Sequence, residues 1–113
     1  MVYAAATPSL AVLEVLVHLD LPAELLPDDL RLLTIEIPDD APSVRADPGS
    51  MDDAACLLFG DAFLDAGDAL TMLVRSVVVP QEWNALINVR HRDMGRVIVR
   101  NDESFQIDPR LLA

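Results

Sequence analysis

The sequence predicts an α/β (α+β) protein in which helices flank a mixed β-sheet, built as a single domain over residues 1–113. Extended apolar runs alternate along the chain with two helical runs, the arrangement expected of this class. A chain of 113 residues is long enough for one hydrophobic core and too short for two. Hydrophobic residues make up 52% of it, which is typical of a packed globule and not of a disordered segment.

The chain begins with a predicted strand, turn and helix. Residues 2–6 are a brief apolar run, after which the Thr7 hydroxyl can cap free amides while Pro8 occupies the first helical position. Residues 10–19 are almost entirely apolar. The helix is therefore predicted to be buried around most of its circumference.

Only Glu14 and His18 interrupt this apolar helix. A carboxylate beside apolar surface is costly to ionise unless a cation or a hydrogen-bond donor meets it, which makes Glu14 a candidate functional residue. The alternative is that Glu14 and His18, one turn apart, form the solvent-facing edge of the helix. The residue pattern alone favours the solvent-facing edge.

The next segments predict a loop, a strand and a second loop. Residues 21–29 contain two prolines and form a predicted connection with one helical turn. Residues 30–37 favour extended structure, and apolar residues on both faces indicate an inner strand. Residues 38–50 hold three prolines and several acids, and they predict a surface loop.

A second helix is predicted over residues 54–66. Ser50 supplies its N-cap, acidic residues in the first turn suit the helix dipole, and Gly67 ends it. Gly60 lies inside the helix, where glycine costs about 1 kcal/mol relative to alanine, so a close packing contact is predicted there. The solvated side is marked by Asp61, Asp65 and Asp68.

Residues 69–79 are the longest strand-like stretch and predict the centre of the sheet, ending at Pro80. Residues 81–88 predict a short helical turn that carries Trp83 as a packing residue. Residues 96–100 and the Phe105 segment predict a terminal β-hairpin around a turn at 101–103.

Arg110 is expected to pair with a carboxylate and fix the end of the chain.

Earlier in the sequence, Ser76 follows Arg75 in the predicted central strand. A hydroxyl beside a guanidinium could hydrogen-bond a phosphate or a sugar. The alternative is a small residue at a bulge where the strand bends, and the local pattern favours the bulge.

Charge and cysteine content limit the partners and the compartment. The formal net charge is −11, with eight arginines and no lysine, which makes nucleic acid an unlikely partner. Residues 1–72 hold fourteen acids and two arginines, whereas residues 73–113 hold five acids and six arginines, so an anionic ligand would prefer the second part.

The single cysteine, Cys56, predicts a reduced, buried thiol. No stretch has the length of a membrane span or the form of a signal peptide, and a cytoplasmic location is expected.

Strong local motifs are absent. The sequence holds no GxGxxG, GxxxxGK[ST], HExxH or CxxC pattern and no serine-hydrolase elbow. His18 and His91 lack neighbouring residues that would complete a metal site, so no metal is expected.

Three segments together match the pattern of one family. They are VYAAATPSLAVLEVLVHLD at residues 2–20, Gly60 with Asp61, Phe63 and Leu64, and RSVVVPQEWNALIN followed by FQIDPRLL at the C-terminal end. The chain resembles the RES-domain toxins of bacterial toxin–antitoxin systems. That family is named for an arginine, a glutamate and a serine. Glu14 and Ser76 fall at the positions of the second and third, and Tyr3 matches a tyrosine of the family's active site.

The resemblance implies a fold similar to that of ADP-ribosyltransferases and an activity that depletes NAD by cleaving its nicotinamide N-glycosidic bond. NAD is then a substrate, with no other cofactor, and the implied partner is an Xre-type antitoxin. Glu14 would stabilise positive charge on the ribose, and Ser76 would position Glu14 or the ligand. Tyr3 would lie near the nicotinamide ribose.

The chain also departs from the family. The family's arginine belongs to a segment upstream of VYAA, so we expect a domain that is N-terminally truncated, with apolar surface exposed and association into homo-oligomers. Arg75 replaces a proline of the family and is a candidate substitute for the missing arginine, while Val89 and Arg92 replace the prolines of its Asn-Pro-x-His-Pro motif.

Two functions therefore stay open: an NAD-consuming toxin whose start codon is placed too late, or a catalytically inactive remnant that only binds an antitoxin or another protein. Hydrolysis, phosphorolysis and ADP-ribosyl transfer stay equally open, because Glu14 would serve all three.

Overall fold

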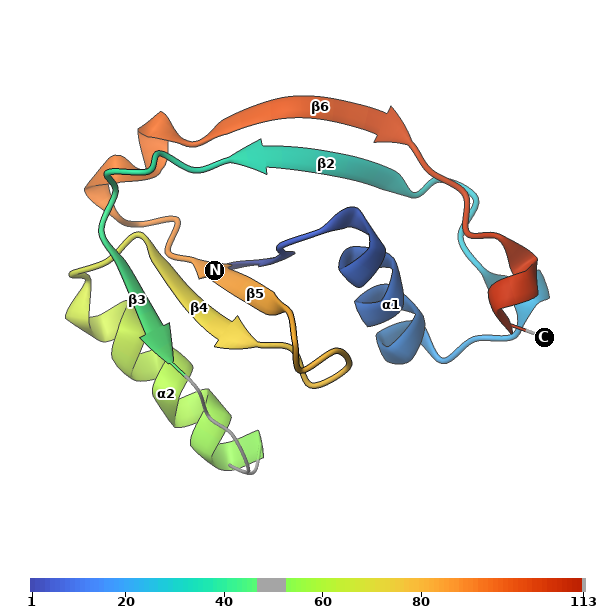
Figure 1. Cartoon of the computed structure of the whole chain (residues 1–113), viewed down its shortest axis with the longest axis horizontal. Helices are drawn as coiled ribbons and strands as arrows, with labels where there is room; N and C mark the ends of the chain where they lie inside the picture. Colours follow the sequence, from blue (N-terminus) through green and yellow to red (C-terminus); the bar gives the residue numbers. More distant parts are fainter. Residues whose placement is uncertain (47–52, 113) are drawn as a thin grey trace.

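The computed structural model describes residues 1–46 and 53–112, and within the second helix it describes the side chains of Leu58 and residues 60–66. Two α-helices, six strands and three short 3₁₀ helices occur in these residues (Figure 1). In chain order they are β1 (Val2–Ala5), α1 (Pro8–Leu19), η1 (Ala23–Leu25), β2 (Arg31–Glu36), β3 (Ser43–Ala46), α2 (Asp53–Ala66), β4 (Thr71–Arg75), β5 (Trp83–Ile87), η2 (Arg92–Arg96), β6 (Ile98–Ser104) and η3 (Pro109–Leu112).

The strands form two sheets, and the predicted mixed α/β class is confirmed. The main sheet has the order β1-β5-β4-β3, in which β1, β5 and β4 are antiparallel neighbours and β3 runs parallel to β4. β2 and β6 form a separate antiparallel ribbon, which arches beside the main sheet in Figure 1. The predicted central position of residues 69–79 is confirmed, although β4 itself covers only the middle of that run.

Both helices cover the same face of the main sheet. Asn84 and Leu86 are two residues apart on β5, so their side chains share one face. Asn84 contacts Glu14 of α1, and Leu86 packs with Phe63 of α2. The two helices therefore share one face of the sheet, α1 at the β5 side and α2 beside β3 and β4 (Figure 1).

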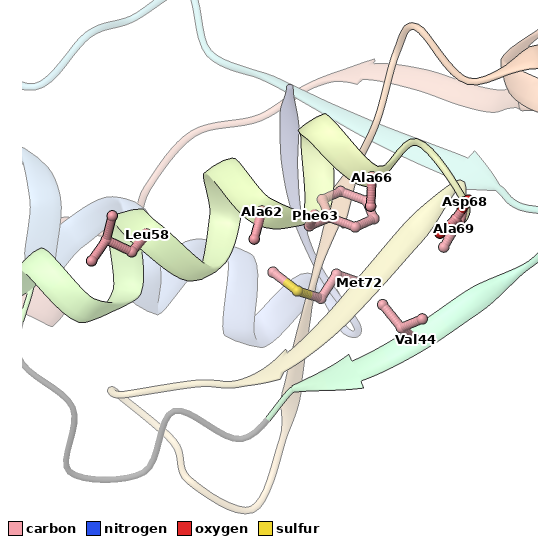
Figure 2. Close-up of a pocket in the computed structure, with 8 residues that line it drawn as sticks. All are labelled: Val44, Leu58, Ala62, Phe63, Ala66, Asp68, Ala69 and Met72. Carbon is pink, nitrogen blue, oxygen red and sulfur yellow. The ribbon is translucent and has the colours of Figure 1, made fainter.

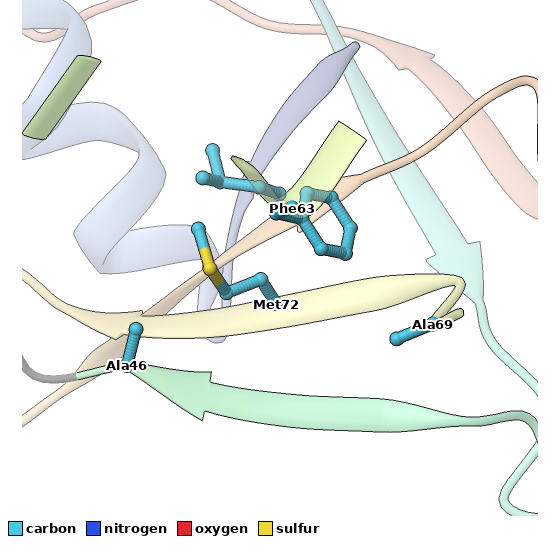
Figure 3. Packing of buried hydrophobic residues seen from close by; sticks show 5 residues of the cluster. Ala46, Phe63, Ala69 and Met72 are labelled. Atoms are coloured by element: carbon cyan, nitrogen blue, oxygen red, sulfur yellow. The ribbon is translucent and has the colours of Figure 1, made fainter. Parts of the chain in front are cut away.

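The hydrophobic core lies between α2 and the main sheet. Ala46, Met72 and Leu86 come from three neighbouring strands, and Phe63 and Ala69 complete the cluster. Figure 3 shows the Met72 side chain rising from β4 toward Phe63. Phe63 is 7% exposed, and burial of such a side chain contributes about 1.5–3 kcal/mol to stability.

The start of α1 follows the sequence prediction. Thr7 is the N-cap and its hydroxyl accepts a hydrogen bond from Leu10 N at 3.1 Å, while Pro8 opens the first turn. The predicted burial around most of the circumference is wrong, because only Leu10 and Glu14 are buried. Val17 is 59% exposed, so the helix buries one narrow stripe against the sheet, and its other apolar residues are half-buried or exposed.

Two predicted non-strand segments belong to the main sheet. The predicted helical turn at residues 81–88 is wrong, because β5 lies there and pairs with both β1 and β4. β3 occupies part of the predicted surface loop at 38–50. In each case the pairing with a distant strand decides the conformation, which local composition does not reveal.

The separate ribbon corrects two further predictions. Residues 30–37 do not form an inner strand, because β2 pairs only with β6 within the described chain, and Leu33 is 48% exposed. The predicted terminal hairpin is wrong, because β6 runs straight through the expected turn at 101–103. Arg31 Nε lies 2.5 Å from Asp102 Oδ1, and a second cross-strand pair joins Arg100 to Glu36. Both pairs are exposed to solvent, and exposed ion pairs contribute little to stability, so the ribbon depends mainly on the backbone pairing of β2 with β6.

Several smaller expectations have clear outcomes. The predicted connection at residues 21–29 does contain a helical turn, η1, and α2 ends at Gly67, whose positive φ of 65° favours glycine. A Cβ added at Gly60 would meet the Met1 side chain at 3.9 Å, an ordinary contact distance, so no close approach demands glycine there. Arg110 pairs with Asp108, so the predicted carboxylate partner is confirmed, whereas the fixing of the chain end stays a prediction. The exposed positions of α2 and its end include Asp61, Asp65 and Asp68.

The Ser50 cap and the buried Cys56 thiol concern positions outside those that the structure describes, and both stay predictions. Neither α-helix, as far as it is described, has the length and hydropathy that crossing a membrane requires. The expected association into oligomers is also untested, although the ribbon exposes Leu33, Ile98 and Val99 by 45–56%.

Candidate functional site

Glu14 is the centre of a buried polar cluster between α1 and the main sheet. Glu14 is only 9% exposed to solvent. Its Oε1 atom accepts hydrogen bonds from Ser76 Oγ at 2.7 Å and from Asn84 Nδ2 at 2.8 Å. The interpretation of Glu14 as part of a solvent-facing edge is therefore wrong. Leu10 and Glu14, one turn apart, form the stripe that α1 presents to the sheet.

Ser76 is positioned by the turn that follows β4. It is 2% exposed, and its Oγ accepts hydrogen bonds from Val78 N at 3.1 Å and Val79 N at 3.0 Å. A hydroxyl has one proton to donate, and here that proton goes to Glu14. The serine therefore shapes the turn where the strand ends and also holds the carboxylate.

Asn84 joins the two other polar groups of the cluster. Its Nδ2 donates to Glu14 Oε1 and, at 2.7 Å, to the Tyr3 hydroxyl. Its Oδ1 is buried and has no hydrogen-bond partner in the described structure. Rotating the amide by half a turn would set Oδ1 against Glu14 Oε1, and two acceptors cannot bond to each other, so the hydrogen bond to Glu14 fixes this orientation. The amide nitrogen is therefore directed at Glu14 and Tyr3, and the amide oxygen points away from both.

Sequence reasoning missed Asn84 because it assigned this segment to a helix. Within a strand the residue alternates with Leu86, and its position in the inward row marks it as a buried polar residue. If residues 83–87 are recognised as a strand, the alternation of inward and outward side chains identifies Asn84 as a buried polar residue.

Tyr3 stands at the exposed side of the cluster. Tyr3 is 55% exposed to solvent. Its hydroxyl oxygen accepts a hydrogen bond from Asn84, so the hydroxyl proton stays available to a ligand. Partial burial raises the pKa of Tyr3 above its usual value of 10.0, and the Glu14 carboxylate raises it further, while the Asn84 hydrogen bond acts the other way. Tyr3 is therefore a neutral hydrogen-bond donor at physiological pH.

Alkaline titration tests this coupling, because Tyr3 is the only tyrosine of the chain. We expect the phenolate absorbance to appear with a midpoint above 10, and the midpoint to move down in Glu14→Gln without returning fully, since burial remains. A pKa raised on folding gives stability that is present below pH 10 and lost as the pH rises through the folded pKa. Identical midpoints in the two proteins would contradict the contact.

Arg75 lies apart from this cluster. Its Cζ is 4.5 Å from the centroid of the Trp83 ring, and its Nη1 donates to Pro80 O at 3.1 Å. Trp83 precedes Asn84 in β5, and successive side chains of a strand point to opposite faces. Arg45 also lies over the same ring, at 4.9 Å. The structure thus brings three of the four predicted site residues together and places the arginine on the other face of the sheet.

Neither histidine side chain contacts the side chains of the Glu14 cluster. His18 Nδ1 lies 2.7 Å from the backbone oxygen of Glu14, one turn back along α1. His91 is buried in the turn that follows β5. No group of three or more histidine, cysteine or acidic side chains that could hold a metal occurs in the described residues.

An apolar pocket of about 440 Å³ lies elsewhere, between α2 and strands β3 and β4 (Figure 2). Phe63, Met72 and Val44 line it, and no member of the Glu14 cluster does. The pocket is a gap at the edge of the core, so its position gives no support to a ligand beside Glu14.

The Glu14 cluster has a defined chemical capacity. Both donors bond to Oε1, and Oε2 accepts no hydrogen bond from any residue that the structure describes. A carboxylate held in this way by neutral donors keeps one oxygen for a positive charge that develops beside it. The Tyr3 hydroxyl adds a neutral donor on the open side.

Comparison with known proteins identifies the family. Residues 1–108 match the model of the RES domain. The protein Toxin Res of Pseudomonas putida is 39% identical over 114 residues, covering 97% of this chain and 78% of the relative. The Prs ADP-ribosylating toxin of a Sphingobium species is 36% identical over 121 residues, covering 98% of this chain and 74% of the relative. Toxin Res of Yersinia enterocolitica is 35% identical over 97% of this chain and 76% of its own length. The resemblance first seen in three segments thus extends over nearly the whole sequence, and the chain belongs to the RES-domain family of toxins.

Proposed function

We propose that this protein is the toxin of a toxin–antitoxin pair and depletes NAD by cleaving the bond between nicotinamide and ribose. The observation that carries the proposal is the buried Glu14 carboxylate, held by Ser76 and Asn84 with Oε2 left without a partner among the described residues. Family membership supports it, because one relative is named an ADP-ribosylating toxin, and ADP-ribosylation breaks this same bond. We also propose that the fold is similar to that of ADP-ribosyltransferases.

The reaction requires stabilisation of a cation. As the bond from ribose C1 to the pyridinium nitrogen breaks, nicotinamide leaves with the electron pair and positive charge builds on the ribose. Glu14 would stabilise that charge more strongly than it stabilises the substrate, which lowers the barrier. A nucleophile then forms a new bond to C1 and loses its proton to solvent or base. That nucleophile is water, phosphate or a protein side chain, and Glu14 serves all three.

The neighbouring groups would hold the carboxylate and the ribose. Ser76 and Asn84 fix the rotamer of Glu14 through bonds of 2.7 and 2.8 Å to Oε1. Tyr3, the exposed member, would donate its proton to the ribose or the nicotinamide amide. In this arrangement Glu14 is the catalytic residue, Tyr3 binds substrate, and Ser76 and Asn84 are positioning residues.

A protein that consumes NAD in its own cell must be held inactive until it is needed. We therefore propose that its partner is an Xre-type antitoxin, and relatives named as toxins support this. The competing hypothesis is a catalytically inactive protein that only binds such a partner. An NAD assay separates the two.

Incubation of the protein with NAD, followed by mass spectrometry of all products, tests the proposal. We expect free nicotinamide together with one of three products: ADP-ribose for hydrolysis, its 1-phosphate for phosphorolysis, or ADP-ribosylated protein for transfer. NAD that stays intact in the presence of a folded, antitoxin-free chain would favour the binding-only alternative.

Ser76→Ala tests the positioning role of the hydroxyl. A hydrogen bond to a charged group contributes about 1.5–3 kcal/mol, so we expect kcat/KM for NAD to fall by about tenfold or somewhat more. Ser104→Ala, at an exposed position of β6, is the matched control and should leave the rate unchanged. Equal rates for Ser76→Ala and the native protein would remove Ser76 from the site.

Arg75→Ala tests whether this arginine replaces the one that the family carries upstream. If it did, the variant would lose NAD binding. Because its guanidinium lies over Trp83, on the sheet face opposite Asn84, we expect NAD affinity measured by calorimetric titration to change less than about twofold. A loss of binding would place the NAD diphosphate on the Trp83 face.

A further inference from the structure

A polar pocket of about 290 Å³ lies where the turn after β5 meets the end of α2. Asn88, Arg90, His91 and Arg92 line it from the turn, and Asp68 lines it from the segment after α2. Nothing in the NAD chemistry described above uses these residues. In sequence, His91 lacks the neighbours of a metal site.

Two of the lining side chains are nine-tenths or more buried. Asn88 is 3% exposed, and its Oδ1 accepts a hydrogen bond from Arg90 N at 3.0 Å. His91 is 7% exposed, and its Nδ1 accepts from Asp93 N at 3.0 Å. With Nδ1 occupied as an acceptor, a neutral His91 ring carries its proton on Nε2.

Each of these side chains keeps a donor without a partner. No hydrogen bond from Asn88 Nδ2 or His91 Nε2 to any residue of the described structure occurs. Asn84 Oδ1 is the only polar side-chain atom, among those described, that is both sealed from solvent and unpartnered. The two nitrogens are therefore open to solvent, and they belong to residues that line the pocket. A ligand in the pocket that carries acceptor oxygens can therefore bond to both nitrogens in place of water.

The charges around the pocket favour an anion. Neither Arg90 nor Arg92 forms an ion pair within the described chain, whereas Arg96, in the same segment, pairs with Asp40 and Asp93. Asp68 is the one acid of the lining and has no ion pair among the described residues, so two arginines face one carboxylate. The Asp93 carboxylate lies 3.8 Å from His91 Nδ1 and is paired with Arg96. In a chain of net charge −11, this is a local region of positive charge.

We propose that this pocket binds the phosphate group of a small molecule. The tetrahedral phosphate presents several acceptor oxygens, which suit the Asn88 amide and the His91 imidazole inside the pocket and the two guanidinium groups at its edge. A planar carboxylate, with two oxygens, would leave more of these donors unused. The volume admits either inorganic phosphate or the phosphate end of a small ester.

The pocket is separate from the Glu14 cluster. Asn88 follows Asn84 by four residues along β5 and its end, which places it about 13 Å away in an extended chain. The proposal therefore does not rest on NAD cleavage, and either one can fail without the other.

Nuclear magnetic resonance of the two histidine rings tests the proposal, because His18 lies outside the pocket and serves as an internal reference. Titration of the 113-residue protein with sodium phosphate, and separately with glycerol phosphate, should shift the His91 ring signals in a saturable manner and leave those of His18 in place. Tighter binding of the free ion identifies inorganic phosphate as the ligand, and tighter binding of the ester identifies a phosphorylated small molecule. Sodium chloride at equal ionic strength controls for screening.

The arginines provide the second arm of the test. Arg90→Ala combined with Arg92→Ala should weaken phosphate binding by about tenfold or more, because two charge-assisted donors are lost. Arg110→Ala, at an exposed residue paired with Asp108, should bind phosphate as the native protein does. Unmoved His91 signals with both probes, or an affinity that the double substitution leaves unchanged, would overturn the proposal.

Discussion

Glu14→Gln is expected to reduce nicotinamide release from NAD by about 10³-fold or more, because it removes the negative charge that would stabilise the ribose cation. Glutamine keeps a side-chain oxygen that can accept from Ser76 and Asn84, so the melting temperature should stay within a few degrees of the native value. Chromatographic measurement of nicotinamide gives the rate, and circular dichroism checks the fold.

The matched control for this change is Glu24→Gln, which makes the same substitution at an exposed residue of η1. It should leave the rate of nicotinamide release unchanged. Undiminished release by a folded Glu14→Gln protein would remove Glu14 from the chemistry.

Asn84→Asp is expected to damage both stability and activity. It replaces the amide that lies 2.8 Å from Glu14 Oε1 by a second carboxylate, in a position that is fully buried. Two carboxylates at this distance cannot both be ionised without a large penalty, so one must take up a proton. At neutral pH we expect a stability loss of about 3 kcal/mol and a fall in nicotinamide release of about 10²-fold.

The pH dependence of the stability loss identifies its cause. Lowering the pH supplies the shared proton, so the free energy of unfolding of Asn84→Asp should move back toward the native value in acid. Urea denaturation at two pH values measures this. Asn101→Asp makes the same exchange on the exposed strand β6 and should cost little at either pH. A loss that does not depend on pH would mean that the carboxylates do not interact.

Local signals in the sequence predicted part of this fold. Thr7 and Pro8 define the start of α1, and Gly67 defines the end of α2, because caps and glycine turns depend on neighbouring residues only. The long apolar run around β4 indicated a central strand for the same reason. These elements needed no knowledge of the tertiary structure.

Strand pairing between distant segments accounts for the errors. β3 is a short strand in a proline-rich stretch and exists because it pairs with β4. β6 is exposed along its whole length and carries polar residues at 101–103, so no apolar alternation marks it, and its backbone pairing with β2 makes it a strand. Composition favours a turn there, and the cross-strand contacts override it.

The candidate site was predictable in part. Tyr3, Glu14 and Ser76 were accessible through the family pattern, and the structure brings them within one hydrogen-bonded cluster. The burial of Glu14 could not be derived from the helix alone, because the apolar residues surround it on every side and only the sheet selects one stripe. Asn84 stayed hidden because its role depends on the correct assignment of β5.

A crystal structure of Glu14→Gln with NAD tests whether Glu14 faces the nicotinamide ribose, since this variant should bind the substrate without consuming it. We expect the nicotinamide ribose to lie against the side chain of residue 14, with its C1 atom in contact with that side chain and the Tyr3 hydroxyl bonded to the ribose or the nicotinamide amide. NAD bound on the Trp83 face, or no NAD at the Tyr3 side of the cluster at saturating concentration, would contradict it.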